Sequence, residues 1–278
     1  MALIDSLEKF ILSIPTARGS EWPALEPFAN TADGTIQSLL TGSDLYTYIE
    51  ALEDTSVLKT SLRNLIAFQT YRDAIPFVDL IQTQNGFGVV SGNNIAPASR
   101  ERVERLMLWC TNSIDKTTDL LITQLMDDST ALAKWTKSKR FNNLTNCLFV
   151  TGIDFAGYTK TDGSRTDFLK AKGQLLAFQK NELSTLISAD YLAELIAQNR
   201  SNTLTEVNSF IVEICKLILV KLLEKDIDEA KKLFNNLGYM FEKKLSDYPT
   251  YAASDEYKLK ISPVYENKLE YPTFFFGM

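Results

Sequence analysis

The amino-acid sequence predicts a mainly α-helical protein, a helical bundle with one inserted β-hairpin and an extended C-terminal tail. Apolar residues recur at helical spacing through most of the chain. Only 12 glycines and 8 prolines occur among the 278 residues, which disfavours a turn-dense all-β fold. Hydrophobic residues make up 45% of the chain, enough to form a large packed core.

The first feature along the chain is an internal repeat. In the segment 36–68 a helix ends at Leu40, a short loop follows, and Leu45 and Ile49 begin a new apolar face. The segment 183–214 has the same order of features. The equivalent residues, each 147 positions later, are Ile187, Leu192 and Ile196. One interpretation is two similar helical halves, and the alternative is that two amphipathic helices align by chance.

A β-hairpin is expected at about residues 79–91. The β-prone segments DLIQTQ and FGVVSG flank Asn85 and Gly86. Asn-Gly is the preferred two-residue type I′ turn, because both central residues need a positive φ. The spacing of Gly86, Gly88 and Gly92 departs from the dinucleotide-binding and P-loop motifs. Because an isolated hairpin is marginally stable in water, it needs a packing partner, either its own body or a neighbouring subunit.

Helices are expected over most of the remaining chain. The longest begins after Ser99, a favourable N-cap with Glu101 in the first turn, and ends near Asp127. The short connection near Asp226 predicts an antiparallel helical pair. The helices of this pair cover residues 205–225 and 226–245, and further helices are expected at residues 131–139, 166–188 and 190–199.

The C-terminal segment loses the helical spacing and gains prolines and aromatic residues, which together favour extended chain. It closes on three consecutive phenylalanines, and each costs about 1.5–3 kcal/mol when it is exposed to water instead of buried. A surface of this chain or of a partner is therefore expected to cover them. The predicted organisation is an N-terminal helical half at 1–145, a C-terminal helical half at 146–246 and an extended tail at 247–278.

The composition argues against most enzyme chemistry. There is no histidine, which removes histidine-assisted nucleophiles, histidine acid–base catalysis and histidine metal sites. Three dispersed cysteines, Cys110, Cys147 and Cys215, form no zinc or disulfide pattern and are expected to be buried. An enzyme without histidine would have to use carboxylates such as Asp162 and Asp167, which a turn and a helix start explain better. No catalytic residue, cofactor or metal ligand is therefore expected.

Charge and hydropathy limit the partners. The net charge is −6, so binding of nucleic acid through phosphate neutralisation is not expected as the main function. The one modest basic segment, Lys134 to Arg140, is typical of a solvated helix face, and its alternative is contact with an acidic partner or nucleic acid. The most hydrophobic stretch, Ser209 to Lys225, contains three charged residues, so it predicts a buried helix and no membrane contact.

Three segments carry a resemblance: AIPFVDLIQTQNGFGVVSGNNIAPASRERVERL, LLTGSDLY and NKLEYPTFFFG. The chain resembles an uncharacterised family of proteins encoded by phages and prophages of Bacteroidetes bacteria. The resemblance implies a virion protein of a tailed phage, assembled in the host cytoplasm, in the form of a head–tail neck adaptor. Such an adaptor forms a ring with copies of itself and contacts portal or tail proteins.

The hairpin and the tail are the expected partner-binding extensions of such a ring, by strand addition and by aromatic anchors. The residues expected to bind partners are Asn85, Gly86, Phe87, Val89, Tyr265, Phe274, Phe275 and Phe276. Two alternatives stay open, a cytoplasmic helical binding or regulatory module and, more remotely, an enzyme without histidine.

Overall fold

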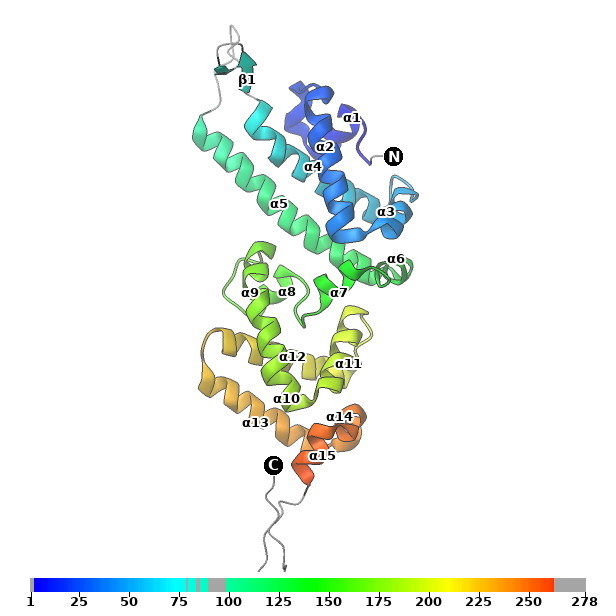
Figure 1. Ribbon diagram of the computed structural model, residues 1–278, viewed down its shortest axis with the longest axis vertical. Coiled ribbons are helices and arrows are strands. Elements are labelled where there is room, and N and C mark those ends of the chain that lie inside the picture. Colours follow the sequence, from blue (N-terminus) through cyan, green and yellow to red (C-terminus); the bar gives the residue numbers. More distant parts are fainter. Residues whose placement is uncertain (1–2, 79, 84–85, 90–98, 263–278) are drawn as a thin grey trace, which may run out of the picture.

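The computed structural model describes residues 3–78, 80–83, 86–89 and 99–262, and this part of the chain is mainly helical. Figure 1 shows an elongated body in which the first and second parts of the chain are stacked along the long axis. The first part consists of α1 (Leu7–Ser13), η1 (Pro15–Gly19), α2 (Trp22–Ile36), η2 (Gln37–Thr41), α3 (Ser43–Glu50), α4 (Val57–Val78), β1 (Leu80–Thr83), β2 (Gly86–Val89), α5 (Arg100–Asp127), α6 (Ser129–Trp135) and α7 (Lys139–Thr145). The second part consists of α8 (Gly152–Ala156), α9 (Arg165–Phe178), η3 (Gln179–Leu183), α10 (Ser184–Ile187), α11 (Ala189–Arg200), α12 (Glu206–Leu223), α13 (Ile227–Lys243), η4 (Leu245–Asp247), α14 (Pro249–Ala253) and α15 (Asp255–Ile261).

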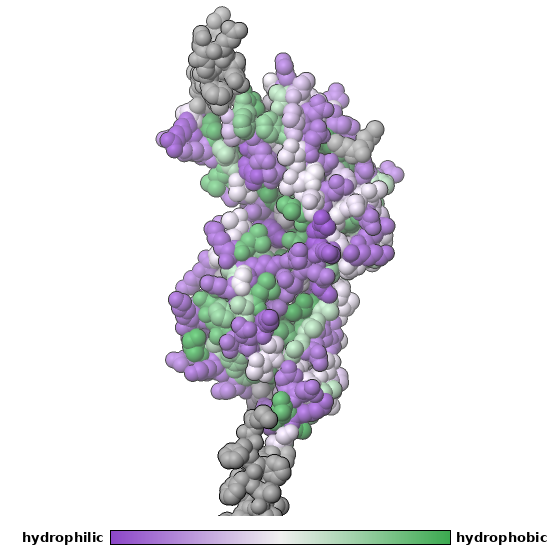
Figure 2. Space-filling model, viewed as in Figure 1, coloured by the Kyte–Doolittle hydropathy of each residue, from purple (hydrophilic) through white to green (hydrophobic). Residues whose placement is uncertain are grey.

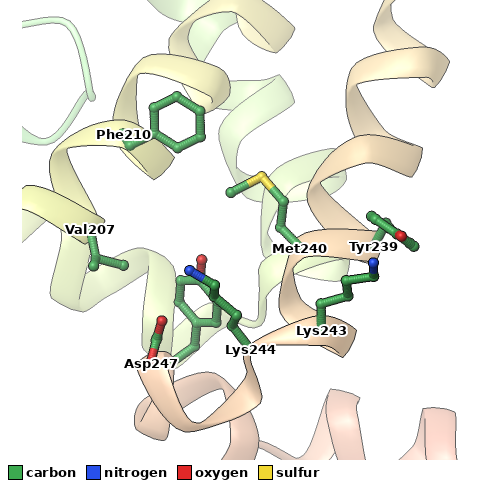
Figure 3. A pocket seen from close by; sticks show the side chains of 8 residues that line it. Val207, Phe210, Tyr239, Met240, Lys243, Lys244 and Asp247 are labelled. Atoms are coloured by element: carbon green, nitrogen blue, oxygen red, sulfur yellow. The ribbon is translucent and has the colours of Figure 1, made fainter.

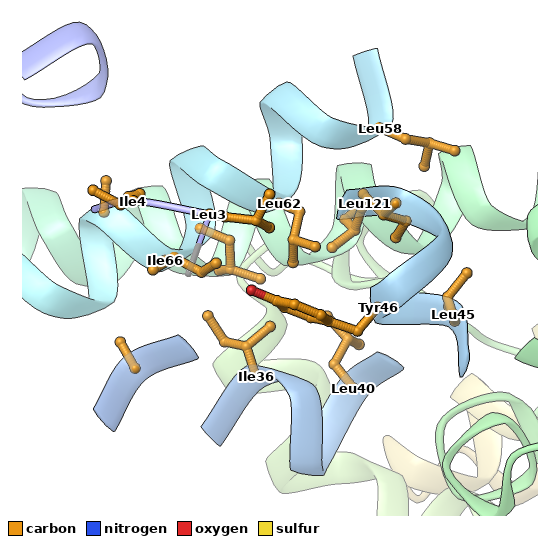
Figure 4. Packing of buried hydrophobic residues seen from close by; sticks show 14 of the residues in the cluster. Leu3, Ile4, Ile36, Leu40, Leu45, Tyr46, Leu58, Leu62, Ile66 and Leu121 are labelled. Carbon is orange, nitrogen blue, oxygen red and sulfur yellow. The ribbon is translucent and has the colours of Figure 1, made fainter. Parts of the chain in front are cut away.

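Two separate hydrophobic clusters form the core. The first is built from residues between Leu3 and Val150, and the second from residues between Cys147 and Tyr251. In the first cluster the Tyr46 ring lies among the aliphatic side chains of α2, η2 and α4 (Figure 4). Its hydroxyl donates a hydrogen bond to Asp33, and burial, reinforced by this carboxylate, raises the pKa of Tyr46. The two clusters divide near residues 147–150; the domain division at 145 stays a prediction.

A buried ion pair joins the two parts of the chain. Asp119 on α5 accepts a hydrogen bond from Nη1 of Arg165, the first residue of α9, at 2.6 Å. Its other oxygen accepts the backbone N–H of Gly152 at 2.6 Å. Burial raises the pKa of the Asp119 carboxyl, and the Arg165 guanidinium opposes this effect. Both carboxylate oxygens of Asp119 are thus used to hold α8 and α9 against the long helix.

The proposed internal repeat has a local structural counterpart. A π-helical segment precedes a sharp break in both places, η2 before Gly42 and η3, followed by α10, before Ser188. The break residues have nearly the same backbone angles, φ 76° and ψ 168° for Gly42, and φ 71° and ψ 152° for Ser188. Non-glycine residues rarely adopt this conformation, so its recurrence favours the interpretation of two similar halves.

Several expected helices are confirmed and two expectations are wrong. The long helix after Ser99 is α5, and the helical pair is α12 and α13, which pack against each other. A single helix at 131–139 is wrong, because α6 ends at Trp135 and Ser138 starts α7 by accepting the backbone N–H of Arg140 at 3.2 Å. Extended chain from residue 247 is wrong for the residues of α14 and α15. There the tyrosines Tyr248 and Tyr251 pack on Phe241. This packing stabilises the fold of the segment, although its apolar residues do not recur at helical spacing.

The strands β1 and β2 pair antiparallel, with Leu80 opposite Val89 and Thr83 opposite Gly86. Residues 79, 84–85 and 90–98 lie outside the described part of the chain, and so do the side chains of the strands. Gly86 pairs with Thr83 and so belongs to the ladder, and positions 84 and 85 separate the two strands. The expectation that Asn85 and Gly86 are the two central residues of the turn is therefore wrong. Figure 1 places β1 at one end of the body and α15 at the other. Within the described residues, no helix combines the length and the apolar character that crossing a membrane requires.

Candidate functional site

The residues predicted to bind partners fall at the edges of the described structure. Gly86, Phe87 and Val89 form part of β2, with side chains outside the description. Asn85, Tyr265 and the three phenylalanines at 274–276 lie outside the described residues altogether. Their role in partner binding stays a prediction.

The carboxylates considered for catalysis have structural partners. Asp162 accepts the backbone N–H of Ser164 at 3.0 Å, which closes a turn, and Asp167 forms an ion pair with Lys170 at 2.7 Å in the first turn of α9. No group of three or more metal-ligating side chains is present in residues 3–78 and 99–262. The first turn of α9 and the loop before it therefore account for both carboxylates.

All three cysteines are buried and free, as the sequence predicts. Burial raises the pKa of the Cys215 thiol to about 12 and of the Cys110 thiol to about 11. Both groups therefore stay protonated at neutral pH, and a protonated thiol is a poor nucleophile. The cysteines serve as small apolar side chains of the core.

An apolar groove lies between α12 and α13. The turn that aligns these helices is a Schellman motif, in which Lys225 adopts φ 62° and its N–H donates to the carbonyl of Leu222 at 3.1 Å. The next N–H, of Asp226, donates to the carbonyl of Lys221 at 2.9 Å, and the Asp226 carboxylate accepts the N–H of Glu229 at 3.3 Å. Helix α12 thus ends and α13 begins within three residues, and the two helices lie side by side.

The groove, here called the α12–α13 groove, has a volume of about 370 Å³. It is lined by Val207, Phe210, Tyr239, Met240, Lys243, Lys244, Asp247 and Tyr248. Val207 and Phe210 come from α12 and face Tyr239 and Met240 of α13 across the opening (Figure 3). The side chains of Phe210 and Tyr239 are 51% and 57% exposed, although both are aromatic.

Charged side chains lie at the rim of the α12–α13 groove. The ammonium group of Lys243 lies 4.7 Å from the centre of the Tyr239 ring, a cation–π contact, and Lys244 and Asp247 are close by. Tyr248 closes the inner side, and burial raises the pKa of its hydroxyl. An apolar centre with a charged rim is the typical anatomy of a protein-binding surface.

The last described helix is attached beside this groove. Lys260 on α15 forms an ion pair with Glu242 on α13 at 2.7 Å, and Glu242 precedes Lys243 of the groove. This ion pair attaches α15 to α13.

The apolar spacing along the sequence does not predict the α12–α13 groove, although the sequence of α12 contains a signal for it. Helix α12 is apolar around most of its circumference, more than one buried face requires. Val207 and Phe210 are three positions apart and form a second apolar face on it. Only the position of α13 shows that this face stays open. Hydrophobic residues are also visible on one side of this half of the body in Figure 2.

Exposed apolar side chains also occur on α4 and α5, in the other half of the molecule. Phe77 and Val78 at the end of α4 are largely exposed, and so are Leu108 and Trp109 on α5. Phe77 contacts Phe28 at 5.5 Å between ring centres, which holds it in place. Exposed apolar side chains are thus present in both halves of the molecule.

Comparison with known proteins gives one match. The model of a family of unknown function, DUF6712, matches residues 25–145, less than half of the chain. This segment begins in α2 and ends with α7, so it covers most of the first hydrophobic cluster. No curated protein matches the chain. No solved structure matches it either.

Proposed function

We propose that this protein is a structural subunit of a tailed-phage virion, a head–tail neck adaptor that binds its neighbours through exposed apolar surfaces. The proposal rests first on the α12–α13 groove. Leaving its aromatic side chains in water costs about 1.5–3 kcal/mol each, and an apolar partner surface would recover most of this free energy. Aromatic side chains in a pocket with a polar rim are the common energetic centres of protein–protein interfaces.

The arrangement of the surfaces supports a ring. The α12–α13 groove and the exposed side chains of Phe77 and Trp109 lie in different halves of an elongated body. Two different surfaces on one subunit suit head-to-tail association, which closes into a ring when the rotation between subunits is appropriate. In this proposal the strands β1 and β2, and the segment of the chain that follows α15, extend the contact to portal or tail proteins and to neighbouring copies.

The roles assigned to the chemistry-bearing side chains also favour a structural function. Asp162 and Asp167 serve a turn and a helix start, and the cysteines are buried in the core. The α12–α13 groove leaves apolar side chains exposed, and its complement is an apolar segment of another protein.

The experiment is incorporation into particles. Phage carrying the substitutions Phe210→Ser and Tyr239→Ser would be purified, and the protein quantified by mass spectrometry relative to the major capsid protein. Loss of two central aromatic contacts should lower incorporation at least about tenfold, because such residues each contribute about 2 kcal/mol or more. The matched control carries Leu12→Ser and Ile153→Ser, two exposed apolar residues outside the groove, and should be incorporated normally.

A truncation tests the tail separately. The cut should follow Ser262, because removal of α15 would also remove the ion pair between Lys260 and Glu242. The truncated protein should fold with an unchanged circular dichroism spectrum and fail to enter particles. Absence of the intact protein from particles would refute the virion assignment, and normal incorporation of the groove variant would refute the role of the groove.

A further inference from the structure

A second pocket lies between the start of α3 and the connection from α6 to α7, far in sequence from the α12–α13 groove. Its volume is about 410 Å³, many times the roughly 30 Å³ that one water molecule occupies in the liquid. It is lined by Thr41, Gly42, Ser43, Asp44, Leu45, Lys134, Lys137, Ser138, Lys139 and Arg140. We refer to it as the α3 pocket.

The α3 pocket concentrates positive charge in a chain whose net charge is −6. Arg140 donates from Nε to the carbonyl of Ser38 at 2.7 Å, and the ammonium group of Lys134 lies 5.5 Å from the centre of the Tyr48 ring. Lys137 and Lys139 are exposed and form no ion pair with any described residue. Asp44, the one carboxylate that lines the pocket, forms no ion pair within the described chain either. The positive charges of the four cationic side chains in the lining are therefore not neutralised by an ion pair with a described residue.

The first turn of α3 adds backbone donors. Its N-cap is Gly42, which has no side chain to accept a hydrogen bond from the turn. The N–H groups of Ser43, Asp44 and Leu45 make no hydrogen bond to a residue that the structure describes. Free N–H groups at the positive end of a helix dipole are suited to bind an anion.

Thr41 provides an independent observation. It lines the α3 pocket, its side chain is 1% exposed, and its hydroxyl has no hydrogen-bond partner among the described residues. A buried hydroxyl without a partner costs about 1–3 kcal/mol, so native proteins nearly always provide one. Because Thr41 lines the α3 pocket, an acceptor atom of a ligand bound there would supply the missing partner.

We propose that the α3 pocket binds a phosphate group. The donors come from three directions, the first turn of α3, the hydroxyl of Thr41 and the cations of α6 and α7. A phosphate offers several acceptor oxygens in a tetrahedral arrangement and carries up to two negative charges, which fits more of these donors at once than a carboxylate does. Free phosphate compounds and the backbone of a polynucleotide offer this same group.

The test is a titration of the full-length protein with inorganic phosphate. Binding is measured by isothermal titration calorimetry in a buffer without sulfate or phosphate. The unaltered protein should bind with saturable heat. The double variant Lys137→Gln with Lys139→Gln should bind about tenfold more weakly or worse, since it removes two charge-assisted contacts. The variant Thr41→Val keeps the side-chain shape, and we expect about a tenfold loss when its hydroxyl bond to the anion is missing.

The matched control removes two lysines elsewhere, Lys180→Gln with Lys231→Gln, both exposed and without an ion pair to a described residue. It changes the net charge by the same amount and should bind phosphate normally. Equal weakening in this control would reduce the effect to net charge and overturn the proposal. Absence of saturable binding to the unaltered protein would overturn it as well, and an unchanged melting temperature shows that each variant is folded.

A second arm identifies the source of the phosphate. Fluorescence anisotropy would measure binding of a labelled double-stranded oligonucleotide at two salt concentrations. Oligonucleotide binding that inorganic phosphate displaces, and that the lysine variant loses, would support a polynucleotide backbone as the ligand. Phosphate binding without oligonucleotide binding would support a small phosphate compound in the same site.

Discussion

The buried ion pair between Asp119 and Arg165 should dominate the coupling between the two halves of the molecule. Both side chains are almost completely buried, and each oxygen of the Asp119 carboxylate accepts a hydrogen bond at 2.6 Å. Replacing Asp119 with alanine leaves the guanidinium buried without a counter-charge and the N–H of Gly152 without an acceptor. Breaking a buried pair in this way costs about 3–5 kcal/mol of unfolding free energy.

The variant Asp119→Asn should cost about half as much, because the amide keeps the shape and one acceptor oxygen but loses the charge. In the double variant Asp119→Ala with Arg165→Met no charge is left behind. Its cost should therefore fall short of the sum of the two single substitutions by at least about 1.5 kcal/mol. As a control, Lys258→Ala removes the exposed pair with Asp255 and should change the unfolding free energy by less than about 0.5 kcal/mol.

Urea unfolding followed by two signals measures this effect. The three tryptophans, Trp22, Trp109 and Trp135, all belong to the first part of the chain, so their fluorescence reports on that half alone. Far-ultraviolet circular dichroism reports on the helices of both halves. In Asp119→Ala the two transitions should separate, because the halves then unfold independently. A loss below about 1 kcal/mol, or additive single substitutions, would refute the reasoning.

Four further predictions concern local structure. Lys225→Gly should raise the unfolding free energy by about 0.5–1 kcal/mol, because glycine tolerates φ 62°, whereas Lys225→Ala should not. Gly42→Ala should lower it by about 1–3 kcal/mol, since the added Cβ would meet Oγ of Ser138 at 3.2 Å and φ is 76°. Trp135→Phe should lower it by about 1–3 kcal/mol by removing the 2.9 Å hydrogen bond from Nε1 to the carbonyl of Leu40. Urea titration measures all three, and the opposite sign would contradict each. All three cysteines should react with a thiol reagent only when urea unfolds the chain, because burial raises the pKa of each thiol; rapid labelling of the native protein would contradict this.

Local patterns in the sequence were sufficient to predict most helices. Ser99 and the apolar spacing after it predict α5, and the short connection at Asp226 predicts the pairing of α12 with α13. These predictions succeed because caps, turns and amphipathic spacing act between residues a few positions apart. The burial of the cysteines is confirmed for a related reason, since small apolar residues in helical segments face the core.

Predictions were wrong where distant contacts decide the local conformation. Tyr251 is helical in α14, where its ring packs on Phe241 of α13, and the spacing of the residues around Tyr251 does not indicate this contact. The single helix expected at 131–139 is divided at Thr136 to Ser138. There Ser138, in the connection between α6 and α7, packs against Gly42. Trp135 donates a hydrogen bond to the carbonyl of Leu40, a residue 95 positions earlier in the chain.

Composition and apolar spacing predicted the helical class and the order of the main helices. They also argued against catalysis by histidine or cysteine. These predictions need only residue counts and the spacing of residues that are close in the sequence. The two pockets were decided by tertiary structure alone. Phe210 and Tyr239 line one groove only because α13 leaves part of α12 uncovered. The basic segment from Lys134 to Arg140 is an ordinary solvated stretch until α3 presents its first turn, and Thr41 its unpartnered hydroxyl, to the same pocket. A surface site depends on which elements meet and on which donors remain unpaired there, and neither quantity is encoded in the spacing of residues along one segment.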